Sequence, residues 1–242
     1  MSALGHYLEE EGIATVAIAS IRPQAEKTRP PRALWVPFEL GRPLAPPGDA
    51  VFQKRVLVTA LKLLERSDGP VLLDDFTDDD PRERPDPAWQ APTSGLASPQ
   101  PGNPSGDMLA NALQAELLAL APFYARSCVA RGRSTVGLSG LAPAACGDYV
   151  VAWLRGAPPA VSPVADMSPV LCLRFAIDDL KAFVLEAAQW TGRPSAQQLG
   201  DWLWNETATG AAIRALRSRL IASNDDRAKL IAGMFLVPGL RV

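Results

Sequence analysis

The stretch from Arg29 to Asp49, RPPRALWVPFELGRPLAPPGD, decides the fold prediction for the first third of this chain. It holds six prolines and two glycines in 21 residues, a density that ordinary strands and ordinary loops both avoid. Residues 33–36 have the short apolar pattern of a buried strand, and Gly41-Arg42-Pro43 is typical of a sharp turn. Because α/β proteins bind ligands at loops that follow the carboxyl ends of strands, this loop is a candidate site.

Alternating helix and strand patterns surround that loop. Asp49 is well placed to cap the helix that follows it. The sequence therefore predicts an α/β N-terminal segment over residues 1–76, Rossmann-like and built on a short parallel sheet. Its expected elements are a helix at 3–11, strands at 13–18, 33–36 and 70–73, and a helix at 49–66, with residues 21–31 as a linker.

Beyond this segment the composition changes. Residues 77–106 contain seven prolines and almost no aliphatic side chains, which predicts a linker or a surface excursion in which Trp89 docks locally. Residues 107–242 are expected to be mostly helical, with one strand near residues 134–138 that could return to the N-terminal sheet. The expected helices cover 108–130, 143–154, 178–190, 195–207, 210–222 and 225–235, with Asp178 as one N-cap and Ser195 with Gln198 as a capping box.

Composition narrows the class of protein and of partner. The 242 residues carry a formal net charge of −2, which gives no reason to expect nucleic acid or a membrane as partner. No apolar run is long enough to span a bilayer, and the acidic N-terminus is unlike a signal peptide. Three cysteines without a Cys-x-x-Cys spacing fit a reducing cytoplasm. A small-molecule substrate, a protein subunit and self-association stay open as partners.

Two motifs suggest chemistry that their context does not support. Residues 74–78, DDFTD, match a magnesium-diphosphate pattern, but they follow a strand and enter an acidic linker, so a solvated surface is expected. Residues 134–140, STVGLSG, lack the second glycine of a nucleophile elbow, because position 141 is Leu141. His6 is the only histidine, so a serine triad, a zinc site and a di-iron site are not expected. The sequence predicts neither a cofactor nor a metal.

The candidate site residues are few. Arg32, Gly41 and Arg42 belong to the proline-rich stretch from Arg29 to Asp49. The two arginines could bind a carboxylate there or pair with Glu26 or Glu39. Cys146 lies in the first turns of a predicted helix, which could lower its pKa and make it a reactive thiol, although a buried structural role is the alternative. Trp202 and Trp204 face different sides of a helix, so either one of them is exposed or the helix is packed on two sides.

The N-terminal segment also carries a family resemblance. Residues 12–18, GIATVAI, residues 30–44, PPRALWVPFELGRPL, and the spaced Pro47, Asp49 and Gln53 resemble part of the selenoprotein B family of glycine, sarcosine, betaine and D-proline reductases. In that family a comparable run lies downstream of a redox-active selenocysteine or cysteine. Here no cysteine precedes the matched segment, Ala14 stands where the family usually has proline, and Ala45 where glycine is common.

The resemblance implies a cytoplasmic reductase-like protein, as a subunit or a truncated form whose redox residue is supplied elsewhere. The alternative is a non-catalytic binding or assembly protein on the same scaffold. The catalytic residues, the substrate and the electron donor stay unknown at this level.

Overall fold

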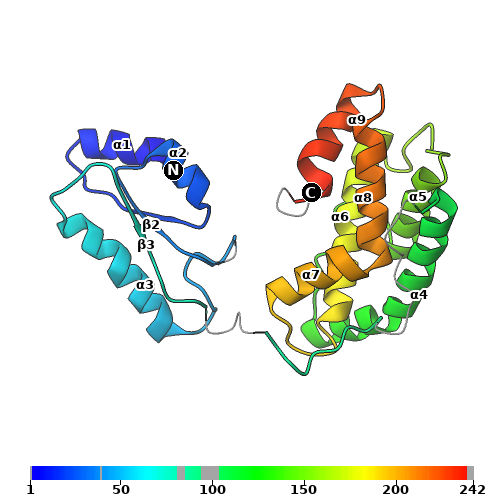
Figure 1. Ribbon diagram of the computed structural model, residues 1–242, viewed down its shortest axis with the longest axis horizontal. Helices are drawn as coiled ribbons and strands as arrows, with labels where there is room; N and C mark the ends of the chain where they lie inside the picture. The colour runs from blue at the N-terminus through cyan, green and yellow to red at the C-terminus, as the bar shows by residue number, and fades with distance from the viewer. Residues whose placement is uncertain (1, 39, 81–84, 94–103, 239–242) are drawn as a thin grey trace. The chain divides into compact units, whose positions relative to one another are not determined.

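A computed structural model describes residues 2–38, 40–80, 85–93 and 104–238 (Figure 1). The chain divides into two compact units, Met1–Arg84 and Pro85–Val242. The boundary lies within the predicted linker 77–106, of which residues 81–84 and 94–103 lie outside the described residues.

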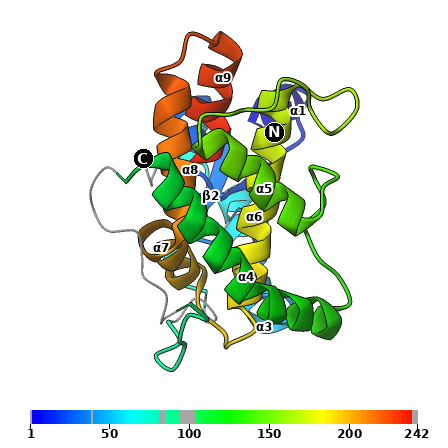
Figure 2. The ribbon, with the colours of Figure 1, turned by 90° about the vertical axis from the view of Figure 1, so that its right-hand side faces the viewer.

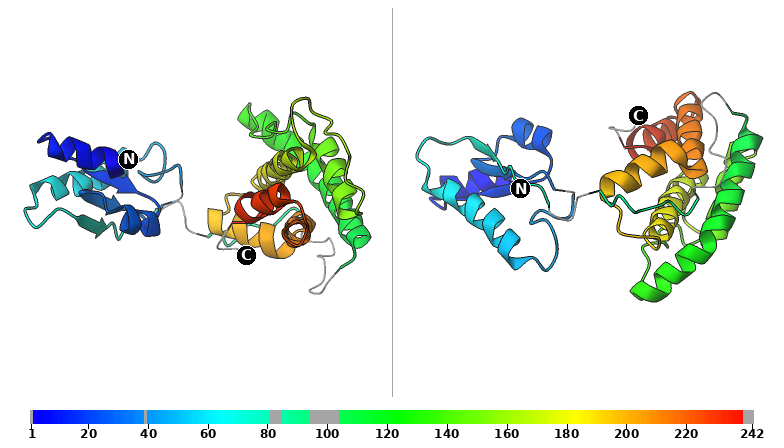
Figure 3. Two further views of the ribbon diagram at one scale, coloured as in Figure 1. Left: turned by 90° about the horizontal axis from the view of Figure 1, so that it is seen from above. Right: turned by 60° about the horizontal axis from the view of Figure 1, so that its bottom comes forward.

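The first unit is an α/β structure on a three-stranded parallel sheet with the strand order β1-β2-β3. Its sheet and the flanking helices are seen from two further directions in Figure 3. In chain order its elements are α1 (Ser2–Glu10), β1 (Ala17–Ala19), α2 (Arg22–Thr28), β2 (Arg32–Trp35), α3 (Ala50–Lys62), the 3₁₀ turn η1 (Leu63–Glu65) and β3 (Leu72–Asp75).

The two faces of the sheet are covered by different helices. Ile18 and Leu34 are register partners and pack in one hydrophobic cluster with Phe52 and Val56 of α3. On the opposite face, the guanidinium of Arg22 in α2 lies 6.0 Å from the centre of the Trp35 ring. Alternate residues of a strand point to opposite faces, so α2 and α3 cover opposite sides of the sheet, as Figure 1 shows.

Helix α2 was not predicted, because Pro23 and the polar residues around it are typical of a linker. Proline is compatible with the first turn of a helix, where its missing N–H would have no helical partner, and α2 begins in this way. Its C-cap, Arg29, adopts a left-handed conformation with φ 45°. The structure therefore has a short helix, α2, where the sequence pattern predicted a linker.

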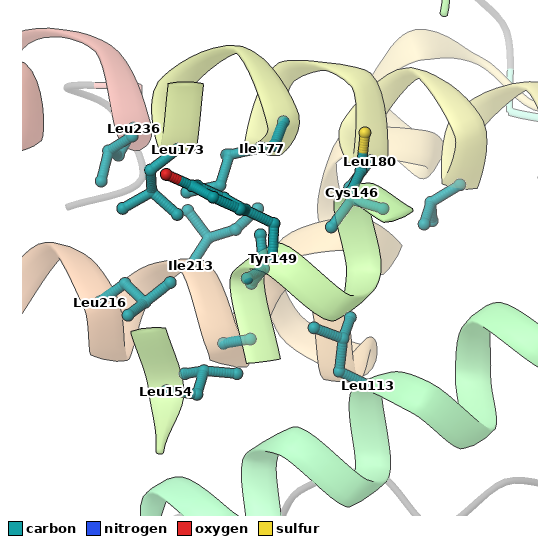
Figure 4. Close-up of a cluster of buried hydrophobic side chains, with 14 of the residues drawn as sticks. Leu113, Cys146, Tyr149, Leu154, Leu173, Ile177, Leu180, Ile213, Leu216 and Leu236 are labelled. Atoms are coloured by element: carbon teal, nitrogen blue, oxygen red, sulfur yellow. The ribbon is translucent and has the colours of Figure 1, made fainter. Parts of the chain in front are cut away.

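The second unit is a bundle of helices (Figure 2). Helix α4 packs against α5, α6 and α8, and the core between them is apolar. Figure 4 shows Tyr149 of α5 beside Leu173 and Ile177 of α6, and Cys146 of α5 beside Leu180. The elements are α4 (Gly106–Arg131), α5 (Pro143–Leu154), α6 (Pro169–Ala188), α7 (Ala196–Glu206), α8 (Ala208–Ile221), α9 (Asp226–Ile231) and the π-helical turn η2 (Ala232–Leu236).

Two predictions for this unit are wrong. Residues 134–138 form no strand, because buried carboxylates of α6, rather than a neighbouring strand, accept hydrogen bonds from this segment. Helix α6 begins at Pro169 and not near Asp178: Ser168 is its N-cap and accepts a hydrogen bond from the Leu171 N–H. The apolar run ahead of Asp178 is typical of a strand, yet it is equally suited to a helix buried on most sides.

Other local predictions are confirmed. Ser195 and Gln198 form the expected capping box at the start of α7, and Asp49 caps α3 by accepting from the Phe52 N–H. Trp89 docks on the helical unit: its indole N–H donates to the Ala188 carbonyl and the Thr191 hydroxyl, and its ring meets Trp202 edge to face. Residues 85–93 of the predicted linker are therefore attached to the second unit, whereas Asp78 pairs with Arg55 in the first unit.

Candidate functional site

A cleft of about 880 Å³ opens in the α/β unit. Its walls come from α1, β1, α2 and the loop that follows β2. The side chains that line it are small, apolar or neutral, apart from one histidine, and none of the described lining residues is Asp, Glu, Lys or Arg. The lining residues include Ser2, Ala3, His6, residues 17–21, Gln24, Ala25, Thr28, Leu40, Gly41 and Pro43.

The cleft follows the open edge of β1. Five consecutive residues, 17–21, line it. Successive side chains of a strand point to opposite faces, so a cleft over one face would meet only every second residue. The three strand residues 17–19 all meet the cleft, so the cleft runs along the backbone edge instead, and Ser20 and Ile21 continue its wall between β1 and α2. Since β1 is an outer strand of the sheet, that edge is the one not paired with β2.

Polar side chains tie α1 to the end of α2 beside this cleft. The Nε2 atom of His6 lies 2.8 Å from the Arg29 carbonyl oxygen. Because a carbonyl can only accept, Nε2 carries the proton, which leaves Nδ1 of a neutral His6 as an acceptor. The Thr28 hydroxyl donates to the Gln24 carbonyl, so the Ser2 hydroxyl, 2.8 Å away, donates to Thr28.

The loop that follows β2 is held in a defined shape. Gly41 has φ +92°, a conformation that favours glycine, and open space surrounds the position a Cβ would take. Further along, the Gln53 side chain donates to the Pro46 carbonyl at 3.0 Å, and Asp49 caps α3. The proline-rich loop with its sharp turn at residues 41–43 therefore contributes Leu40, Gly41 and Pro43 to the cleft wall.

The two candidate arginines lie in different environments. Arg32 is largely buried and its Nη1 donates to Glu9 Oε1 at 2.5 Å; Glu9 also accepts from the Thr15 N–H at 2.6 Å. The hydrogen bond from Arg32, followed by that from Thr15, holds the pKa of Glu9 below its usual value. Arg32 is thus engaged in an ion pair with Glu9 and lines no part of the cleft. Arg42 is exposed between Gly41 and Pro43.

Cys146 is a core residue. Its thiol is fully buried, 3.3 Å from the Ser139 hydroxyl, and burial raises its pKa. Burial therefore favours the structural role of Cys146, because desolvation acts against the position of this thiol near the start of α5. Cys128 and Cys172 of the helical unit also form no disulfide, and the sequence of residues 1–84 contains no cysteine.

Three buried carboxylates of the helical unit were missed by sequence reasoning. Glu116 of α4 accepts hydrogen bonds from the N–H groups of Ala208 and Thr209 and from the Thr209 hydroxyl, so it caps α8 from another helix. Burial raises the pKa of Glu116 despite these bonds. Asp179 and Glu186, seven residues apart on α6, hold residues 134–139. Acidic residues on the buried face of an otherwise apolar helix are the signal that could have revealed them.

Asp179 and Glu186 stabilise this loop by hydrogen bonding. Asp179 accepts from the N–H groups of Gly137, Leu138 and Ser139 and from the Ser139 hydroxyl, at 2.5 to 2.9 Å. Burial alone would raise the pKa of Asp179, but these donors outweigh burial and lower it. The pKa of Glu186 is lowered in the same way, by Thr135 and Ser134 against burial. All these donors belong to the chain itself, so this cluster is structural.

The remaining predicted features have structural roles. Trp202 and Trp204 are both buried, which confirms a helix packed on two sides. Asp74 and Asp75 lie on β3, where they pair with Arg66 and Arg22. In the part of the chain that is described, no group of three or more His, Cys, Asp or Glu side chains could hold a metal ion. Within the same ranges, no helix has the length and apolar character that crossing a bilayer requires.

Comparison with protein families, with curated proteins and with solved structures finds no match to this chain. The cleft along β1 is therefore the site on which a functional proposal rests.

Proposed function

We propose that this protein is a binding protein whose α/β unit holds an uncharged ligand in the cleft along the open edge of β1, without thiol chemistry of its own. The observation that carries this proposal is the cleft itself: about 880 Å³, within the usual size range of ligand sites, and lined by neutral groups. The unit is thus proposed to be a small Rossmann-like scaffold that keeps a binding site and has no redox residue in its own sequence.

The side chains that line the cleft determine which class of ligand it can bind. A charged group that leaves water needs an opposite charge or several hydrogen bonds to offset its lost hydration. The described lining residues supply hydroxyls from Ser2 and Thr28, an amide from Gln24 and the ring of His6, but no fixed charge. An uncharged ligand with an apolar body and a few hydrogen-bonding groups matches this lining best.

A second candidate is a reductase subunit related to the selenoprotein B family. Leu40, Gly41 and Pro43 belong to the stretch that carries the resemblance, and they form part of the cleft wall. Glycine, sarcosine, betaine and D-proline all carry a carboxylate. Arg42 is the cation nearest in sequence to these wall residues, and a guanidinium binds a carboxylate well. In this case a thiol or selenol from another chain would supply the redox step, in the cytoplasm.

One titration series separates the candidates. The full ¹⁵N-labelled chain is titrated with a library of uncharged small molecules and, separately, with glycine, sarcosine, betaine and D-proline. If the binding proposal is right, uncharged compounds shift the amide resonances of residues 17–21 and 40–42. Ala3→Trp, which places an indole at the cleft wall, then weakens binding by about tenfold or more. Leu4→Trp, on the same helix but not in the cleft wall, leaves binding unchanged.

Each outcome has a clear meaning. Shifts caused by the four carboxylates and abolished by Arg42→Ala would favour the reductase subunit and overturn the preference for uncharged ligands. Shifts scattered over the chain, or equal in the Ala3→Trp and Leu4→Trp variants, would show that the cleft is not a site. Thermal melts of each variant confirm that a lost signal is not a lost fold.

A further inference from the structure

The backbone of β1 offers an unused hydrogen-bonding edge inside the cleft. The Val36 N–H donates to the Ala19 carbonyl at 2.9 Å, and Ala19 is the register partner of Trp35. In a parallel ladder, alternate residues point their N–H and C=O groups toward the same neighbour. Ala17 and Ala19 therefore point toward β2, and the N–H and C=O of Ile18, between them, point away from it into the cleft.

An open edge of this kind is a template for another strand. Unpaired N–H and C=O groups on an outer strand pair readily with a further extended segment, and proteins usually cover or blunt such edges. Among the described residues, no hydrogen bond is formed to the outward groups of Ile18 from a side chain or from outside the sheet. The groups are accessible, since the cleft runs directly along residues 17–21.

The surroundings of this edge are suited to a peptide. Ala3 of α1 and Ala25 of α2 present only methyl groups, so the helical wall leaves space beside the strand. Leu40, Gly41 and Pro43 form another part of the wall. Ser2 and Gln24 add neutral polar groups. A bound strand would place its side chains against this lining, in which none of the described residues is Asp, Glu, Lys or Arg.

We propose that the cleft binds an extended, uncharged peptide segment of another protein, which adds to β1 as a fourth strand of the sheet. The proposal rests on the proposed binding function and names its partner class. Main-chain hydrogen bonds to Ile18 supply the recognition that does not depend on sequence, and the small neutral walls select uncharged side chains. Proline is excluded at the positions whose N–H meets β1, because proline lacks that donor.

The experiment starts from random heptapeptides displayed on phage and selected on the full chain. Enriched peptides are synthesised with capped ends, and each is also made with one N-methyl group at successive positions. An N-methyl group removes a backbone donor without changing the side chain. We expect affinity to fall about tenfold or more at the position whose N–H meets the Ile18 carbonyl and to change little at its two neighbours, because donors of a strand alternate in direction.

A protein variant tests the other side of the same bonds. Ile18→Pro removes the outward N–H without removing a donor to β2, whereas Ile18→Val keeps it and serves as the matched control. Peptide binding should be lost in the first and kept in the second. Circular dichroism melts check that both variants are folded. If Ile18→Pro does not fold, the N-methyl series on the wild-type chain decides the question alone.

The failure of this inference differs from the failure of the binding proposal. Uncharged small molecules that bind the cleft, with no peptide enriched over the Ala3→Trp variant, would overturn the peptide inference and leave the binding proposal standing. Equal tolerance of N-methylation at all positions would also overturn it. A concentration-dependent dimer in light scattering that Ile18→Pro abolishes would identify a second copy of this chain as the occupant, and so contradict a foreign peptide. No binding of either class would remove both proposals.

Discussion

Arg32 and Arg42 are ten residues apart in sequence but differ in what surrounds them. Arg32 is held against Glu9, with 13% of its side chain exposed, whereas Arg42 is exposed on the cleft loop. Removal of one partner of a partly buried ion pair leaves the other without compensation for its lost hydration. An exposed side chain, whatever its partner, contributes little to stability.

We therefore expect Arg32→Ala to lower the free energy of unfolding by about 1 to 2 kcal/mol, and Arg42→Ala to change it by less than about 0.5 kcal/mol. Urea unfolding of both variants beside the wild type provides the measurement. Glu9→Gln is the matched partner variant and should cost nearly as much as Arg32→Ala, with little further loss in the double variant. Equal losses for the two arginines would contradict the structural role of Arg32.

Helix α6 organises the second unit through side chains that sequence patterns treat as surface groups. Asp179 and Glu186 together accept hydrogen bonds from residues 134–139, a segment without regular structure. The short, β-branched pattern of this segment predicted a strand, and that prediction failed because its backbone donors meet carboxylates. Periodicity describes which residues are buried, and it does not say which acceptor completes their hydrogen bonds.

Sequence patterns also predict only part of the cleft. The helices with clear caps and apolar stripes, such as α3 with Asp49 and α7 with Ser195, could be predicted from the sequence. So could the positive φ that a glycine at position 41 permits. The edge position of β1 could not, because strand order depends on packing between distant residues. The pairing of Arg32 with Glu9, 23 residues away, is a tertiary contact of the same kind.

The pH dependence of stability should reveal the role of Asp179. Its pKa in the folded state is lower than the reference value of 3.8, so its ionised form stabilises the fold. That stabilisation is complete above the unfolded pKa and is lost as the pH falls through the folded pKa. Asp179→Asn replaces an acceptor by a group that meets some donors with an N–H, and should cost about 2 kcal/mol at neutral pH.

The measurement is a series of thermal melts between neutral pH and roughly pH 3. The difference between wild type and Asp179→Asn should be largest at neutral pH and shrink at acidic pH, where the wild-type carboxylate becomes protonated. Asp178→Asn is the matched control: Asp178 is adjacent, pairs with Lys181 at 2.7 Å and contacts no part of the 134–139 loop by a hydrogen bond in the described residues. A difference that stays constant with pH would show that the charge of Asp179 is not what holds the loop.

The two units have separate hydrophobic cores, and this separation has a consequence for unfolding. The cluster around Leu34 and Phe52 belongs wholly to Met1–Arg84, and the cluster around Leu113 and Leu173 wholly to Pro85–Val242. The second core is far larger, with residues from every helix of its unit. Small domains bury a smaller fraction of their surface than large ones, so their stability is lower.

We expect the first unit to unfold at lower urea than the second within the intact chain. Hydrogen exchange followed by mass spectrometry at increasing urea measures this, because peptides from each unit are identified separately. Amides of β2 and α3 should lose protection first, while those of α4 and α6 stay protected. Asp179→Asn should then lower the urea midpoint of α4 and α6 peptides and leave that of β2 unchanged, whereas Arg32→Ala should do the reverse. Loss of protection in all four elements at one urea concentration, in the wild type and in both variants, would mean that the chain unfolds as one cooperative body and that separate cores do not make separate folding units.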